Sequence, residues 1–403
     1  MVDLKGQYIK IKAEVDAGIQ EVINNTQFIK GPQIKLFEEN LAHYLNVKHV
    51  IACANGTDAL QIAMMALDLK PGDEIILPVF TYVATAEVIA LLGLTPVMVD
   101  VDKDTFCIDT KLIESKITSK TKAIVPVHLY GQCANMDEIM SIANKHQLFV
   151  IEDTAQALGA SYEMSTETSE MSTERGEMRI NTQNSSPISH LSSPNSQKAG
   201  TIGNIGTTSF FPSKNLGCYG DGGALMTNDD ELAKKIRMIC NHGQSIQYVH
   251  DVIGVNSRLD SIQAAVLNAK LPHLKSYEIA RNEAANWYDE LLGNHPNIII
   301  PKRNPQSTHV FHQYTLQIRN SKKEIRNLIR EELQKRGIPS MVYYPIELHK
   351  QKAFEKFNDN NEHFPVSEML CKTVLSLPIH TEMNKEMVEY ICNNLLEILN
   401  NTD

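Results

Sequence analysis

The chain has 403 residues, of which 42% are hydrophobic and 21% charged, a composition typical of a globular protein. With 38 Lys and Arg against 48 Asp and Glu, its formal net charge is −10, which argues against a surface that binds nucleic acid. No apolar run is long enough to span a bilayer, and the charged N-terminus lacks the apolar core of a signal peptide, so we expect no membrane partner.

The seven cysteines are scattered, odd in number and without C-x-x-C spacing. This pattern predicts reduced thiols that pack in the interior, as in cytoplasmic proteins, rather than a disulfide framework. A chain of 403 residues also suits two domains better than a single core. We therefore expect a cytoplasmic protein with one large and one smaller domain.

Two helices are predicted near the N-terminus, over residues 8–24 and 32–45. Strands and helices then alternate, with strands predicted at 50–53, 74–77, 96–99, 123–127 and 148–151 and helices at 57–69, 82–92, 109–116 and 136–146. Such alternation predicts a doubly wound, mostly parallel sheet covered on both faces by helices. Ligands of such sheets bind beyond the carboxyl ends of the strands, so the polar residues there are candidates for a site.

Residues 163–199 interrupt this pattern with a serine-rich run that carries EMSTE twice, at 163–167 and 170–174. The run has almost no large apolar residues, so it cannot bury enough surface to offset the entropy of ordering. We predict a flexible surface insertion between two parts of the large domain. A lid over the substrate is the alternative.

After Lys214 the sequence predicts a strand at 224–227 and helices at 229–239, 261–271 and 276–292. From about residue 297 the pattern changes to a strand at 310–318, a helix at 322–336, a strand at 339–344 and a helix at 385–399. This predicts a smaller α/β layer separate from the large sheet. We assign residues 1–255 to the large domain and 256–403 to the small one, with the boundary somewhere between 245 and 275.

Lys214 lies between an apolar run at 209–211 and a glycine-rich loop at 217–223. Burial of a lysine lowers its pKa, and a neutral amine attacks carbonyl carbons, which is how Schiff-base lysines work. The glycines allow sharp turns and a close approach to a flat ligand. An ordinary surface lysine in a turn is the alternative for this residue taken alone.

Three other positions suit the parts of one anionic, aromatic ligand. Gly56 and Thr57 open a helix directly after a strand, where free N–H groups bind phosphate, although Thr57 as an ordinary N-cap would also explain them. Asp153 follows an apolar strand and suits a cation such as a protonated pyridine nitrogen, or it caps the next helix. Tyr82 offers a flat face to a ring, or simply packs.

The order and wording of these motifs resemble the pyridoxal-phosphate nucleotide-sugar aminotransferases of the DegT/StrS family. The resemblance covers the chain from Asp3 to about residue 395, apart from 163–199. The matching segments are CANGTDALQIA (53–63), FTYVATAEVIALLG (80–93), PVHLYGQ (126–132), IEDTAQALGA (151–160), SFFPSKNLGCYGDGGAL (209–225), GVNSRLDSIQAA (254–265) and YYPIELHKQKAF (343–354).

The resemblance implies the α/β fold of type I pyridoxal-phosphate aminotransferases and pyridoxal 5'-phosphate as the cofactor. Lys214 matches the lysine that holds the cofactor's aldehyde carbon, and Asp153 matches the partner of the pyridine nitrogen. The other cofactor-binding residues that it implies are Gln156 near the 3-hydroxyl, Tyr82 against the ring, and Gly56, Thr57 and Ser209 at the phosphate.

Further positions match residues that the family uses across its dimer and toward the sugar. Asn256 matches a residue that reaches the phosphate of the neighbouring subunit, which implies a homodimer with shared active sites. Arg258 matches an arginine on the substrate side. Tyr343, Tyr344 and His349 fall in the C-terminal sugar-facing motif, where the family's usual His-Tyr-Pro is Tyr-Tyr-Pro here.

The implied reaction moves an amino group from glutamate to a ketone on a nucleotide sugar, with Lys214 moving the proton. The wording is most similar to enzymes that aminate C3 of UDP-2-acetamido-2-deoxy-3-oxo-glucuronate for surface polysaccharides such as lipopolysaccharide. In that case Arg258 would meet the uronate carboxylate, a bidentate pairing that suits arginine. UDP-3-oxo-GlcNAc and then a dTDP-3- or 4-keto-6-deoxysugar are the alternative acceptors.

Three other classes are weighed against this interpretation. A sugar 3-dehydratase of the same fold has histidine at the Schiff-base position, so Lys214 disfavours it. A non-catalytic or regulatory protein of this fold is the second, because a fold does not fix a function. A metal enzyme is the third, but the 14 histidines fall in separate motifs without H-x-x-x-H spacing, so we predict no metal site.

Overall fold

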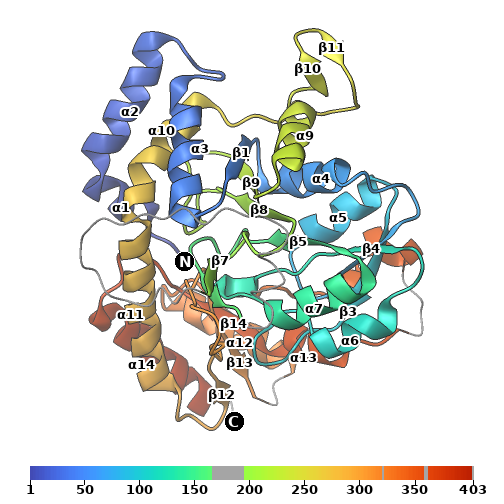
Figure 1. Cartoon of the computed structure of the whole chain (residues 1–403). Coiled ribbons are helices and arrows are strands. Elements are labelled where there is room, and N and C mark those ends of the chain that lie inside the picture. Colours follow the sequence, from blue (N-terminus) through green and yellow to red (C-terminus); the bar gives the residue numbers. More distant parts are fainter. Residues whose placement is uncertain (166–194, 320–321, 358–361, 402–403) are drawn as a thin grey trace.

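The computed structural model of the protein describes residues 1–165, 195–319, 322–357 and 362–401 (Figure 1). Its centre is a seven-stranded sheet with the spatial order β1 (His49–Cys53), β9 (Gly223–Thr227), β8 (Ile205–Ser209), β5 (Phe149–Asp153), β4 (Thr121–Ile124), β2 (Glu74–Pro78) and β3 (Thr95–Val99). All neighbouring strands are parallel except β9, which is antiparallel to both β1 and β8. The predicted mostly parallel sheet is confirmed.

Helices cover both faces of this sheet. They are α3 (Pro32–Leu45), α4 (Gly56–Ala66), α5 (Ala84–Leu91), α6 (Thr110–Ile113), which continues into η1 (Glu114–Lys116), α7 (Met136–His146), α9 (Asp230–Cys240) and α10 (Ser261–Lys270). Because alternate strand residues point to opposite faces, Ile151 packs with α4, α5 and α9, whereas its neighbour Val150 packs with α6 and α7. Val50 packs with α3 and α10 on that second face. The sheet is therefore doubly wound, as predicted.

At one side of the large sheet, the two N-terminal helices pack beside α10. Helices α1 (Leu4–Lys10) and α2 (Lys12–Asn25) lie beside α10, since Ile11 and Val15 share a small apolar cluster with Val266. After α10 the chain passes through η3 (Leu271–His273) into the long α11 (Leu274–Leu292), which descends toward the smaller layer (Figure 1). A hairpin of β10 (Gln244–Ile246) and β11 (Val249–His250) projects from the other side.

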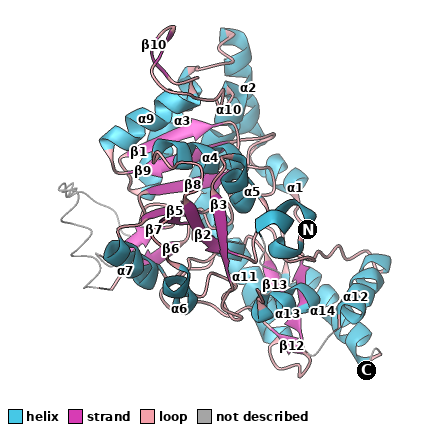
Figure 2. Ribbon diagram, turned by 90° about the vertical axis from the view of Figure 1, so that its right-hand side faces the viewer, coloured by secondary structure: helices cyan, strands magenta, loops and turns pink. Residues whose placement is uncertain are grey.

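The smaller layer is a three-stranded antiparallel sheet that lies below the large one (Figure 2). Its strands are β12 (Ile298–Ile299), β13 (Tyr314–Ile318) and β14 (Val374–Leu377), and its helices are α12 (Lys323–Lys335), α13 (Pro365–Thr373) and α14 (Lys385–Asn400), with α11 packed against α14. The short turns η2 (Leu129–Gly131), η4 (Leu348–Lys350) and η5 (Lys352–Phe357) lie in connecting segments. This is the predicted second α/β layer; the division at residues 255 and 256 stays a prediction.

One predicted strand in the smaller layer is wrong. The segment 339–344 is not a strand, since only Met341 forms an isolated bridge, to Ser376. The small sheet instead contains β14, a strand that was not predicted and that follows α13 directly in the sequence. No polar or glycine-rich stretch separates these two elements, so hydrophobic periodicity alone does not reveal the change from helix to strand.

The predicted insertion at 163–199 is narrower in the structure. Strand β6 (Ser161–Glu163) pairs with β7 (Ser196–Lys198), and Met164 and Ala199 are buried, so both ends of the predicted range belong to the folded body. The rest of the range, 166–194, lies outside the described residues. Its predicted flexibility therefore stays a prediction.

Candidate active site

The candidate phosphate-binding residues lie together where β1 and β8 end. Helix α4 begins at Gly56, and the Asn55 side chain caps it by accepting a hydrogen bond from the Asp58 N–H at 2.8 Å. Thr57 is therefore not the N-cap that the alternative interpretation required. A Cβ added to Gly56 would lie 2.7 Å from the Ser209 Cβ, so these two residues are in direct contact. The first N–H groups of α4 have no partner within the helix and suit a phosphate.

Asp153 lies at the end of β5 and is almost buried. Its carboxylate accepts hydrogen bonds from the Thr85 hydroxyl at 2.9 Å and from the Ala155 N–H at 3.1 Å. Among the residues that the structure describes, no cation lies within ion-pair distance of it. A buried carboxylate without a cationic partner suits a protonated pyridine nitrogen.

Lys214 lies in the β8–β9 connection and is partly buried. Burial lowers the pKa of its amine to about 8, and the negative charge of Asp153 opposes this shift. Within the described chain, no group accepts a hydrogen bond from the amine. A partly neutral, unbonded amine that senses the Asp153 carboxylate fits the residue that holds an aldehyde cofactor.

Aromatic residues from both layers meet beside Asp153. Gln156 donates a hydrogen bond to the Tyr344 hydroxyl at 3.2 Å and accepts one from the Tyr130 N–H at 2.8 Å. The Tyr344 ring lies 6.3 Å from that of Tyr82, and the Tyr130 hydroxyl donates to the Tyr343 carbonyl. The structure thus brings Tyr82, Gln156, Tyr343 and Tyr344 together. The 58% exposure of Tyr82 leaves a ring face open to a ligand.

Two predicted residues, Asn256 and Arg258, are not brought to this cluster by a hydrogen bond, ion pair or ring contact within the described chain. Asn256 and Arg258 are exposed on the loop before α10. Between them, the Ser257 hydroxyl accepts a hydrogen bond from the Ala54 N–H at 3.0 Å, which attaches the loop near the start of α4. His349 is buried, with its ring against Phe364. The proposed roles of these residues stay predictions.

Four residues that were not predicted as site residues also lie at the site in the structure. Thr85 binds Asp153, and Tyr130 binds both Gln156 and Tyr343. His312 is buried, and burial and then the positive charge of Lys214 hold its pKa well below the usual range. The Asn215 amide donates to the Val310 carbonyl at 3.0 Å, which attaches the neighbour of Lys214 to the segment that carries His312. Thr85, Tyr130 and Asn215 lie within the matching segments 80–93, 126–132 and 209–225, which is the signal that the sequence holds for them, whereas His312 lies in none of these segments.

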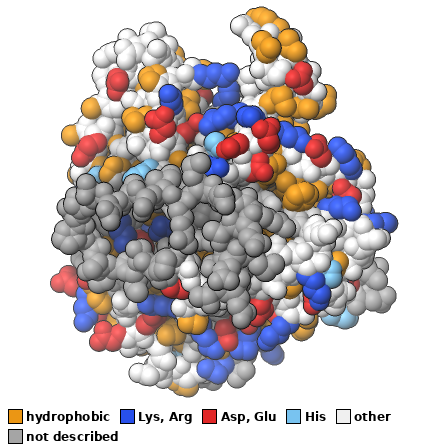
Figure 3. Space-filling model, in the orientation of Figure 1, with side chains coloured by type: hydrophobic (Ala, Val, Ile, Leu, Met, Phe, Trp, Pro, Cys, Tyr) orange, Lys and Arg blue, Asp and Glu red, His pale blue; other side chains and the backbone are white. Residues whose placement is uncertain are grey.

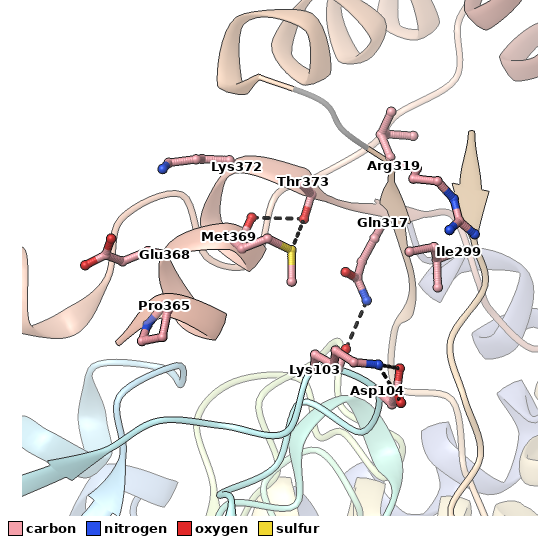
Figure 4. A pocket seen from close by; sticks show the side chains of 11 residues that line it. Lys103, Asp104, Ile299, Gln317, Arg319, Pro365, Glu368, Met369, Lys372 and Thr373 are labelled. Atoms are coloured by element: carbon pink, nitrogen blue, oxygen red, sulfur yellow. Dashed lines mark hydrogen bonds and ion pairs between the residues drawn. The ribbon is translucent and has the colours of Figure 1, made fainter. Parts of the chain in front are cut away.

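Two cavities lie away from Lys214. One, of about 600 Å³, lies between the Lys103–Asp104 turn and the smaller layer, and none of the predicted site residues lines it. In Figure 4 the Gln317 side chain spans toward the backbone of Lys103, whose amine turns to Asp104. The other, of about 490 Å³, is lined by Arg258 together with Lys30, Lys35 and Arg237.

Within the described ranges, no three His, Cys, Asp or Glu side chains are grouped so as to hold a metal ion. The described helices include none that is both long and apolar enough to cross a membrane. All seven cysteines are buried free thiols, as the sequence predicts. The cytoplasmic location stays a prediction.

Comparison with known proteins decides the family. The model of the DegT/DnrJ/EryC1/StrS aminotransferase family matches residues 9–396. The chain belongs to this family. DegT-family aminotransferases use pyridoxal phosphate, and the residues around Lys214 fit it, so the protein is a pyridoxal-phosphate aminotransferase.

Curated relatives of the DegT family match almost the whole chain. The UDP-2-acetamido-2-deoxy-3-oxo-D-glucuronate aminotransferase of Pseudomonas aeruginosa is 44% identical over 97% of this chain and 98% of its own. A pleiotropic regulatory protein of Geobacillus stearothermophilus is 42% identical, covering 98% and 97%. A UDP-N-acetyl-3-dehydro-alpha-D-glucosamine 3-aminotransferase of Acidithiobacillus ferrooxidans is 42% identical, covering 97% and 95%.

Solved structures of DegT-family proteins share the fold. An aminotransferase of the family from Brucella abortus has a TM-score of 0.86 and 37% identity, covering 98% of each chain. NtdA of Bacillus subtilis, solved with bound cofactor PMP, has a TM-score of 0.82 and 30% identity, covering 97% of this chain and 82% of its own.

Proposed function

We propose that this aminotransferase moves an amino group from glutamate to the C3 ketone of UDP-2-acetamido-2-deoxy-3-oxo-glucuronate, for the synthesis of a surface polysaccharide. The observation that carries the chemistry is the Lys214 amine, which is partly buried, has no hydrogen-bond acceptor among the described residues and is subject to the charge of the buried Asp153 carboxylate. The choice of sugar is supported by the 44% identity to the Pseudomonas aeruginosa enzyme.

Each residue of the site has a defined task in this proposal. Gly56, Thr57 and Ser209 hold the phosphate, Tyr82 lies against the ring, Gln156 binds the 3-hydroxyl, and Asp153 keeps the proton on the pyridine nitrogen. Bound pyridoxal phosphate supplies the electron sink that makes loss of the amino acid's Cα proton feasible and carries the amino group between the two substrates. Lys214 holds the cofactor at rest and, once displaced by the donor, moves the proton at the substrate's Cα.

The test is an absorbance titration of the purified holoenzyme, with glutamate first and candidate ketosugars second. We expect glutamate to remove the absorbance of the lysine-bound cofactor, and one ketosugar to restore it. Lys214→Ala should lack this absorbance and turnover, whereas Lys198→Met, which changes another partly buried lysine, should keep both. A Lys214→Ala enzyme with near-normal turnover would refute the proposed role. A wild-type protein that shows no lysine-bound cofactor would instead favour the non-catalytic alternative.

UDP-3-oxo-GlcNAc is the alternative acceptor, supported by the 42% identity to the Acidithiobacillus ferrooxidans enzyme. The two acceptors differ by a carboxylate, which Arg258 would bind. Arg258→Met should lower kcat/KM for the uronate by about 10- to 100-fold, because a charged hydrogen-bonded pair contributes about 1.5–3 kcal/mol. The same change should alter kcat/KM for UDP-3-oxo-GlcNAc little. Equal losses with both sugars would remove Arg258 as the carboxylate partner.

We also propose a homodimer with shared active sites. Its support is a cluster of apolar side chains on and beside the projecting hairpin, namely Ile246, Tyr248, Val249 and Ile253, which are 70%, 81%, 48% and 86% exposed. Figure 3 shows orange side chains over this hairpin and blue ones gathered between it and α2. Exposed apolar clusters of this kind mark protein interfaces. Asn256, exposed nearby on the same connection, would reach the neighbouring subunit's phosphate.

A mixture of inactive variants tests this arrangement. Lys214→Ala and Asn256→Ala protein, unfolded and refolded together, should recover about a quarter of the wild-type activity, because half of the randomly formed dimers are mixed and each has one intact site. Each variant refolded alone is the control. If Asn256 served the site of its own chain, the mixture would show only the average of the two separate activities.

A further inference from the structure

Lys270, the last residue of α10, is a buried lysine without a counter-ion. It is 1% exposed, and in the part of the chain that the structure describes no carboxylate lies within ion-pair distance. Its ammonium donates a hydrogen bond to the Gly217 carbonyl at 2.7 Å and lies 4.5 Å from the centre of the Tyr219 ring. Burial lowers its pKa to about 8, with Cys218 opposing the shift. Both contacts of the ammonium are therefore with the connection that carries Lys214.

A second side chain of α10 holds the same connection. The Gln263 side-chain oxygen accepts a hydrogen bond from the Tyr219 N–H at 2.8 Å. Gln263 and Lys270 are seven residues apart, which places them two turns apart on one face of the helix. Helix α10 thus holds the backbone of residues 217–219 at two points. Gln263 accepts a hydrogen bond from a backbone N–H, and Lys270 donates one to a backbone carbonyl.

Close packing and backbone hydrogen bonds hold the segment between Lys214 and Gly217, the residue that Lys270 binds. A Cβ at Gly217 would lie 2.4 Å from the Pro212 carbonyl oxygen, so Gly217 packs against the turn that precedes Lys214. The Lys214 N–H donates to the Phe211 carbonyl at 2.8 Å, and the Cys218 N–H donates to the Phe210 carbonyl at 2.8 Å. Because this segment has little freedom to rearrange, a displacement of Gly217 should also displace the backbone of Lys214.

Burying an unpaired ammonium is costly, and an apolar side chain of similar length would fill the same space more favourably. The hydrogen bond to Gly217 gives the ammonium a task that such a side chain lacks. We propose that Lys270 is a positioning residue for the reaction: through the Gly217 carbonyl it fixes the turn that aims the Lys214 amine at the cofactor. This inference rests on the proposed role of Lys214.

Lys270→Met tests it, because methionine keeps the length and removes the donor. We expect kcat to fall roughly 10- to 100-fold with KM for glutamate changed little, since a displacement of about 1 Å costs about 100-fold in rate. In the apoprotein, amide hydrogen exchange of residues 211–222 should become faster, a readout that does not depend on catalysis. Lys270→Gln, a shorter neutral donor, should recover part of both losses. Lys275→Met, at an exposed lysine paired with Glu278, is the matched control.

The outcomes separate this inference from the proposed function. If Lys270→Met only lowers the melting temperature, with kcat and exchange at 211–222 unchanged, the residue is structural and the inference is wrong. Should Lys270→Met fail to fold, Lys270→Leu, which also lacks the donor, carries the same measurements, and normal kcat and exchange in Lys270→Leu would overturn the inference. If Lys214→Ala retains bound cofactor and turnover, the proposed role of Lys214 fails first, whatever Lys270 does.

Discussion

The charge of the Asp153 carboxylate acts on the Lys214 amine although no ion pair joins them. Burial disfavours the charged amine and lowers its pKa to about 8, while the negative carboxylate favours the charged form and opposes that shift. The neutral amine is the form that attacks an aldehyde, so its supply grows as the pH rises toward 8 and then levels off. An ordinary lysine, with a pKa of 10.5, would supply little neutral amine at neutral pH.

This coupling predicts a pH profile. The rate at which the apoprotein binds pyridoxal phosphate to Lys214 should rise with a midpoint near pH 8. Asp153→Asn removes the charge that favours the ammonium, so the midpoint should move to lower pH, even though the cofactor is held less firmly. Stopped-flow absorbance at a series of pH values measures both midpoints. Glu163→Gln, at an exposed carboxylate, should leave the midpoint in place, and an upward shift in Asp153→Asn would contradict the coupling.

Residues such as Lys214, Asp153 and Gly56 were predictable because each follows a strand in a motif with its own chemical logic. His312 was not, because it stands in no quoted motif and its closeness to Lys214 arises only from the fold. Thr85 lies within the matching segment 80–93, but nothing in that segment indicates that its hydroxyl binds Asp153. Lys270 is a clearer case. In the sequence it is an ordinary lysine in the last turn of a helix, and nothing local indicates that its amine is buried against Gly217.

At the scale of elements, the end of β5 is held by the residue next to Asp153. Glu152 is fully buried, and its carboxylate accepts hydrogen bonds from the N–H groups of Gly200, Ile202 and Gly203 at 2.9, 2.7 and 2.7 Å. His128 lies at 2.9 Å from it and accepts the Ala134 N–H with its other ring nitrogen, so it donates to Glu152. One side chain therefore joins β5 to two connections.

Glu152→Gln should destabilise the protein by about 2–3 kcal/mol, because the new amide nitrogen faces N–H donors and leaves at least one of them buried without an acceptor. Urea unfolding followed by circular dichroism gives the free energy of unfolding. Glu163→Gln, at the exposed end of β6, is the control and should change it little. A Glu152→Gln protein as stable as wild type would show that water or a local rearrangement satisfies these donors.

The strand–helix alternation between residues 50 and 151 was predictable since each strand is a short apolar run and each helix has clear ends. The smaller layer was less so. The predicted strand at 310–318 begins only at Tyr314, because residues 310–313 are used by Gly131, Tyr130 and Asn215 as hydrogen-bond partners. Tertiary contacts of this kind override local β propensity, and a single sequence does not reveal them.

For the molecule as a whole, histidines that the fold keeps neutral contribute to its loss of stability in acid. Burial lowers the pKa of His309 to about 3 and that of His380 to about 4, and it holds the pKa of His312 well below its usual range. Unfolding releases these imidazoles to water, where their pKa is about 6.5. Below pH 6.5 the unfolded chain binds more protons than the folded one, so stability falls as the pH falls.

His309→Gln should weaken this response. A histidine with a folded pKa of about 3 accounts for about 2 kcal/mol of the stability lost between pH 7 and pH 5, and glutamine does not titrate. The variant starts less stable at pH 7, so the quantity to compare is the difference between the urea-unfolding free energies at the two pH values. His43→Gln, at an exposed position, is the control. An unchanged difference in His309→Gln would mean that His309 is already protonated in the folded protein at pH 5.

The β6–β7 ladder has a consequence for how this chain can vary. Because Glu163 is paired with Ser196, the polypeptide departs from the folded body and returns to it at neighbouring points. The number of residues between these two points can therefore change without altering distances elsewhere in the folded body. The entropy of closing a loop grows only with the logarithm of its length, by about 0.6 kcal/mol for each doubling. Duplication of a short stretch, as in the repeated EMSTE, is therefore a change of length that the catalytic body can accept almost without cost.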